Sequence, residues 1–140
     1  MGSAGSGVPR MRLARALRDQ IIAHALDDAP DECCGLVACR DGEAVEVIRM
    51  ENTAHSPLRY EMDNMELYRA MMRIEGAGLE PGIIYHSHTR SAPYPSQTDI
   101  NLAFYPDSLY LIVGTATPEP VVRAYTIRDG SVQEAPLTLV

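Results

Sequence analysis

The sequence predicts an α+β fold, a mixed α/β sandwich in which a mixed sheet is flanked by helices. Three observations indicate it. Short apolar or alternating runs, typical of strands, occur both before and after the helical segments. Asp-Gly pairs at positions 41–42 and 129–130 separate neighbouring runs and predict β-hairpins. The length of 140 residues is that of one domain.

The first half of the chain predicts a helix followed by a hairpin. Apolar residues recur at helical spacing from Leu17 to Leu26, which favours a helix over 16–29. Pro30 ends it, because the residue before a proline disfavours helical backbone. The run at 33–39 indicates a buried strand, and the alternating segment 44–50 indicates its return strand.

The second half predicts a second helix, a central strand, a short helix and three final strands. Asp63 or Asn64 is the expected N-cap of a helix that runs to about residue 75, and Gly76 and Gly78 end it. Ser96 or Thr98 is the expected cap of the next helix. The remaining elements are a loop at 52–58, a short strand at 58–62, a strand at 82–85, a loop at 89–97, a helix from 99 to about 105, and strands at 109–113, 121–128 and 132–140.

Composition and charge exclude several classes of partner. With 12 Lys and Arg against 19 Asp and Glu, the net charge is −7, so we expect neither nucleic acid nor a membrane surface as partner. No apolar run approaches the roughly 20 residues of a membrane span. The three cysteines are an odd number within seven positions, and residues 1–9 lack a secretory signal, so we expect a cytoplasmic protein. The Gly- and Ser-rich residues 1–9 predict a flexible tail, which leaves 10–140 as the domain.

The stretch from His86 to Asp99 carries the candidate chemistry. Side chains of an extended chain alternate between its faces, so His86 and His88 point to the same side and can reach one ion. A carboxylate at the start of the following helix, Asp99, can complete a third corner. Two histidines, one aspartate and a water form the open arrangement of catalytic Zn²⁺. By itself, however, the pair of histidines is also compatible with a structural role, and Ser96 with a role as a helix cap.

The complete spacing resembles a known family. His86-x-His88, seven residues and then Ser96-x-x-Asp99 reproduce the signature of the JAMM/MPN+ metalloproteases. The segment from Pro30 through Glu32 and Cys34 to Gly35 is similar to the upstream glutamate motif of the bacterial members. The resemblance implies the JAMM/MPN fold, a cytidine-deaminase-like mixed sheet flanked by helices, over about residues 11–138.

The resemblance also implies a role for each site residue. His86, His88 and Asp99 would hold one catalytic Zn²⁺. Glu32 would act as the base that takes a proton from water and passes it to the leaving amine, and Ser96 would stabilise the oxyanion.

The implied substrate is a ubiquitin-like (β-grasp) sulfur-carrier protein. Small bacterial members of the family cleave after the C-terminal Gly-Gly of such a carrier and release cysteine, which serves cysteine biosynthesis. The alternatives are a deubiquitinase-like isopeptidase and a non-catalytic MPN-type module that binds a ubiquitin-like partner. A zinc deaminase is excluded because the chain lacks H-x-E followed by P-C-x-x-C.

Two groups of residues keep alternative interpretations. Cys33 and Cys39 are either small buried residues of a strand or, for Cys33, a group that contacts the metal or a thiol product. Methionines at 62, 65, 71 and 72 indicate one helix face, which lies either in the core or in the contact of a homodimer.

Overall fold

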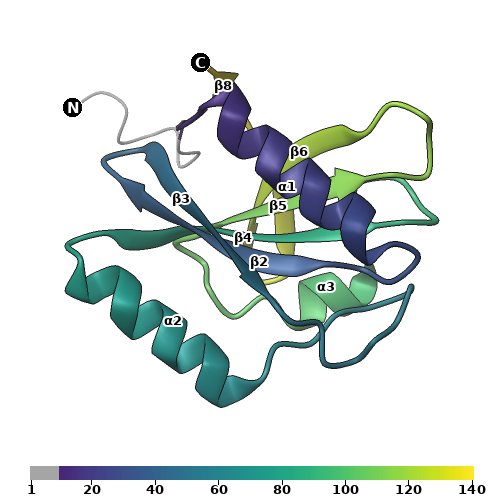
Figure 1. The fold of residues 1–140 in the computed structure, drawn as a ribbon, viewed down its shortest axis with the longest axis horizontal. Helices are drawn as coiled ribbons and strands as arrows, with labels where there is room; N and C mark the ends of the chain where they lie inside the picture. Colours follow the sequence, from purple (N-terminus) through teal and green to yellow (C-terminus); the bar gives the residue numbers. More distant parts are fainter. Residues whose placement is uncertain (1–9) are drawn as a thin grey trace.

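A computed structural model describes residues 10–140; the tail predicted at 1–9 lies outside the described residues. Within the described residues, three helices accompany one mixed sheet of eight strands in the order β7-β6-β5-β4-β2-β3-β1-β8 (Figure 1). The helices are α1 (Arg15–Asp28), α2 (Asn64–Gly76) and α3 (Gln97–Asn101). The strands are β1 (Met11–Leu13), β2 (Cys34–Arg40), β3 (Glu43–Met50), β4 (Glu80–His88), β5 (Leu109–Gly114), β6 (Val121–Arg128), β7 (Ser131–Ala135) and β8 (Leu137–Leu139).

The sheet has a separate apolar core on each face. Helix α1 contributes Ile21 and Ala25 to one core, which also includes Tyr85 of β4. Helix α2 contributes Ala70 and Ile74 to the other. The two helices therefore cover opposite faces of the sheet, as Figure 1 shows. This layered arrangement confirms the predicted α+β sandwich.

The central strands determine where the two histidines lie. Strand β4 runs antiparallel to β2 and parallel to β5, so its carboxyl end meets the beginning of β2 and the end of β5. His86 pairs with Cys34 of β2, and His88 pairs with Gly114 of β5. Because strand residues alternate, these imidazoles lie on the face opposite Tyr85, the face that α2 covers.

Most predicted elements are present, with boundaries within a few residues. The hairpin between β2 and β3 turns at Asp41 and Gly42, both with positive φ, and Asp63 caps α2 by accepting a hydrogen bond from the Glu66 N–H at 3.0 Å. The predicted strand at 82–85 extends to His88, so both histidines belong to β4. Ser96 rather than Thr98 caps α3.

Four details differ from the prediction. Segment 58–62 is not a strand, because Glu61 bonds to Asn52 and Thr53 instead of to a sheet neighbour. Strand 132–140 is divided at Pro136, which has no N–H to donate, and β8 then pairs with β1. Helix α3 ends at Asn101, not near residue 105. The three-residue strand β1 was not predicted, since it is too short to show a periodicity.

None of the described helices is long and apolar enough to cross a membrane.

Candidate metal centre

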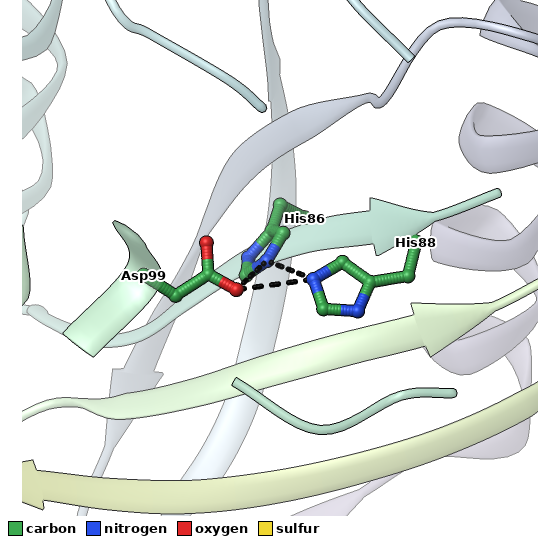
Figure 2. A group of neighbouring side chains, drawn as sticks. All are labelled: His86, His88 and Asp99. Atoms are coloured by element: carbon green, nitrogen blue, oxygen red, sulfur yellow. Dashed lines mark hydrogen bonds and ion pairs between the residues drawn. The ribbon is translucent and has the colours of Figure 1, made fainter. Parts of the chain in front are cut away.

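Three side chains converge on one point at the carboxyl end of β4. Oxygen Oδ2 of Asp99 lies 3.1 Å from Nε2 of His86 and 3.0 Å from Nε2 of His88, and the two Nε2 atoms are 3.1 Å apart (Figure 2). Both histidines are buried. The structure therefore brings together all three predicted metal ligands.

Local sequence explains how Asp99 reaches the histidines. Ser96 and Asp99 form a capping box at the start of α3: the Asp99 N–H donates to Oγ of Ser96 at 3.0 Å, and the Ser96 N–H donates to Oδ2 of Asp99 at 2.9 Å. The backbone at the start of α3 therefore holds Oδ2 of Asp99, the same oxygen that contacts both histidines. Ser96 itself is exposed, and its hydroxyl oxygen acts as the cap.

The two imidazoles are oriented in different ways. Nδ1 of His88 donates to the carbonyl oxygen of Ala92 at 2.8 Å, which leaves the lone pair of Nε2 facing the site. Nδ1 of His86 is buried and has no hydrogen-bond partner among residues 10–140. Its ring is instead stacked on Tyr60, with 4.6 Å between ring centroids and 27° between planes.

Burial and the shared carboxylate shift the ionisation of the three groups. Burial lowers the pKa of His86, so the neutral imidazole is favoured. Burial also acts to lower the pKa of His88, but the hydrogen bonds to Asp99 and Ala92 outweigh it and the pKa is raised. For Asp99, bonds to both histidines outweigh burial and lower the pKa. The site is thus an anionic oxygen facing two ring nitrogens.

This donor set fits zinc. Ligand atoms at about 2.0–2.2 Å from a tetrahedral Zn²⁺ are about 3.3–3.6 Å apart, so the observed separations need to open by only a few tenths of an ångström. All three atoms come from side chains that zinc accepts, and three ligands leave one position open. Two facing imidazole nitrogens also need a cation or proton between them to avoid repulsion of their lone pairs.

Glu32 lies beside this cluster, two residues before the start of β2. Its side chain is buried, with 4% of its surface exposed, and Oε1 has no hydrogen-bond partner among the described residues. Burial raises the pKa of Glu32 to about 8; the charge of His88 opposes this shift and that of Asp99 adds to it. A buried carboxyl group with a free oxygen and a raised pKa is a candidate for proton transfer.

An apolar cavity of about 560 Å³ adjoins the cluster. Asp99, one of the three converging side chains, lines it together with Tyr60, Leu67, Leu102 and Phe104. The side chains of Leu102 and Phe104 are exposed. The cavity therefore offers an apolar surface that leads to the metal site.

Two of the three cysteines, Cys33 and Cys39, lie apart from the converging side chains, whereas Cys34 is the strand partner of His86. All three are buried and free, and burial raises the pKa of each thiol to about 12. Cys33 and Cys39 belong to the core under α1, on the face of the sheet opposite the metal site. The structure thus favours the interpretation of Cys33 as a buried strand residue over a metal contact.

Sequence reasoning missed Tyr60 and Asn52. Tyr60 stacks on His86, and Asn52 bonds to the backbone of Glu32. Asn52 lies in the predicted loop and Tyr60 in the segment 58–62 that was predicted as a short strand, and neither pattern indicates a contact with the site.

Comparisons with known proteins agree with this geometry. Residues 14–128 match the family described as prokaryotic homologs of the JAB domain. The chain is 40% identical over 127 residues to the CysO-cysteine peptidase of Mycobacterium tuberculosis, covering 89% of this chain and 87% of that protein. It is 39% identical over 111 residues to a desampylase of Haloferax volcanii, covering 74% and 79%. A solution structure from Desulfitobacterium hafniense has a TM-score of 0.81 and 31% identity, and covers 93% of this chain and 92% of that chain.

Proposed function

We propose, because this chain belongs to the family of prokaryotic homologs of the JAB domain and is a hydrolase of the JAMM type, that it is a zinc-dependent peptidase acting on a ubiquitin-like sulfur-carrier protein. It would hydrolyse the bond after the carrier's C-terminal Gly-Gly and release cysteine or a short tail. The observation that carries the proposal is the buried Glu32, with one free carboxyl oxygen, beside the cluster of His86, His88 and Asp99.

The proposed mechanism assigns one task to each side chain. His86, His88 and Asp99 would hold Zn²⁺, which when bound would supply a Lewis acid and lower the pKa of water to about 7. Glu32 accepts the proton of the attacking water as the C–O bond forms, and delivers it to the amine nitrogen as the C–N bond breaks. The Ser96 hydroxyl accepts the cap bond with its oxygen, so its own proton remains available to the oxyanion.

The substrate class is supported by the relatives. The relative from Mycobacterium tuberculosis is named a CysO-cysteine peptidase, and the relative from Haloferax volcanii is named a desampylase. A protein from Thermus thermophilus, 37% identical over 90% of this chain, is named a probable protease that cleaves TtuB-protein conjugates. Relatives named as peptidases favour a hydrolase over the non-catalytic binding module. Residues 10–140 would form the single catalytic domain.

The experiment is the intact mass of a sulfur-carrier protein ending in Gly-Gly-Cys, before and after incubation with zinc-loaded enzyme. We expect the wild type to remove one cysteine residue. Glu32→Gln should keep its zinc and lose turnover by at least about 100-fold, the lower end of general acid–base effects. Glu75→Gln, which changes an exposed glutamate of α2, is the matched control and should cleave normally.

Two results would contradict the proposal. Near-normal turnover by Glu32→Gln would place the base elsewhere. Failure of the zinc-loaded wild type to shorten the carrier, together with cleavage of a carrier joined to a lysine side chain, would favour the isopeptidase activity.

A further inference from the structure

The side chain of Asn52 uses its whole hydrogen-bonding capacity. It follows β3 and is 6% exposed. Its Nδ2 donates to the carbonyl oxygens of Glu32 at 2.9 Å and Arg59 at 3.1 Å. Its Oδ1 accepts from the N–H groups of Ala54 and Glu61, both at 3.0 Å. A primary amide has two N–H donors and two acceptor lone pairs, so every one is occupied.

These four bonds join the two segments that face the metal ligands. Arg59 and Glu61 are the neighbours of Tyr60 on either side, and the Tyr60 ring stacks on His86. Of the two remaining partners, Ala54 belongs to the same segment as Asn52, and the other is Glu32, whose N–H also donates to the carbonyl oxygen of Ser56 at 2.9 Å. The segment 52–61 therefore holds the backbone of Glu32 at both its N–H and its carbonyl group.

The orientation of the Glu32 carboxylate depends on this backbone support. Its Oε1 has no hydrogen-bond partner among residues 10–140. A base that is not held through this oxygen must be placed largely by its main chain and by packing. A displacement of about 1 Å in a reacting group can cost about 100-fold in rate.

We infer that Asn52 is a positioning residue, which fixes Glu32 relative to Tyr60 and His86 through bonds to their backbone segments. This inference rests on the proposed role of Glu32. Asn52 touches no reacting group and acts only through the main chain of Glu32 and the residues on either side of Tyr60.

The test is Asn52→Asp, which keeps the size and the acceptor oxygen but, as a carboxylate, cannot donate to Glu32 and Arg59. We expect kcat to fall by about 10- to 100-fold, with KM within about twofold and zinc content unchanged. Thr53→Val is the matched control: it removes one exposed bond to the Glu61 carbonyl in the same segment and should leave kcat unchanged. Asn52→Ser serves as a second variant should the buried aspartate prevent folding. A higher KM with unchanged kcat would overturn the inference.

A double-mutant cycle separates positioning from general destabilisation. If Asn52 acts through Glu32, Asn52→Asp should lower the residual activity of Glu32→Gln by less than about twofold. An equal loss in the wild-type and Glu32→Gln backgrounds would show that Asn52 acts by another route.

Amide hydrogen exchange tests the inference without a measurement of enzyme activity. In the zinc-loaded protein, Asn52→Asp should speed exchange at the Glu32 N–H and leave the Ser87 N–H, which donates to the Cys33 carbonyl oxygen at 3.1 Å, unchanged. If the wild type cleaves no carrier, the proposed function fails but this measurement still applies. Unchanged protection at Glu32 would overturn the positioning role.

Discussion

At the scale of single residues, the two histidines differ in how firmly their rings are held. The ring of His88 is fixed by a hydrogen bond from Nδ1 to the Ala92 carbonyl oxygen. Nδ1 of His86 has no such partner in the described chain, so beyond the contacts at Nε2 its ring is oriented by stacking on Tyr60. Partners that orient a ligand typically change metal affinity by about 10- to 100-fold when removed.

We therefore predict that Tyr60→Leu weakens zinc binding by about tenfold, because the His86 ring loses the surface that orients it. Tyr60→Phe retains the stacked ring and should bind zinc within about threefold of wild type. Competition with a chromophoric chelator measures both affinities. Equal zinc affinity in Tyr60→Leu and the wild type would contradict the orienting role of the ring.

At the scale of elements, the pairing of β2 with β4 depends on one glycine. Gly35 lies opposite Tyr85, whose ring occupies the space where a Cβ would stand. Tyr85 cannot turn away easily, because its hydroxyl oxygen bonds Nδ1 of the buried His24 at 2.7 Å, and Nε2 of His24 lies 3.2 Å from Asp28. This network connects α1 to β4, the strand that carries the two histidines of the proposed metal site.

Gly35→Ala should therefore lower the free energy of unfolding by about 1–3 kcal/mol, since the new methyl group overlaps the Tyr85 ring. Gly76→Ala at the end of α2 is the control: no atom lies within 4 Å of its added Cβ. Urea denaturation compares the two. A Gly35→Ala variant as stable as Gly76→Ala would show that the strands separate at little cost.

The elements also show how far the sequence predicts the molecule. The spacing of His86 and His88 follows from strand alternation and is local, as is the cap at Ser96, so both were predictable. The contact of Tyr60 with His86 joins residues 26 positions apart, and it depends on a segment without sheet pairing. The pairing of β8 with β1 joins the two ends of the described chain, which no local pattern records.

At the scale of the whole molecule, the proposed metal site lies outside the two apolar cores of the sheet. Apolar clusters occupy both faces of the sheet, and the three ligands come only from β4 and α3. The protein should therefore fold without metal and gain stability when metal binds. A ligand at 100 times its Kd that binds only the folded state adds about 2.7 kcal/mol.

For a domain of this size, that free energy corresponds to an increase in Tm on the order of 10 °C. Chelation of the wild type should lower Tm by this amount without abolishing the cooperative transition, and added zinc should restore the original Tm.

His88→Ala removes one proposed ligand, so zinc should no longer raise its Tm. His55→Ala changes an exposed histidine outside the cluster and should keep the zinc-dependent increase in Tm. Differential scanning calorimetry at matched free zinc measures each variant. An unfolded wild-type protein after chelation would mean that the ion belongs to the folding core, and an equal increase in His88→Ala would place the stabilising ion at a different site.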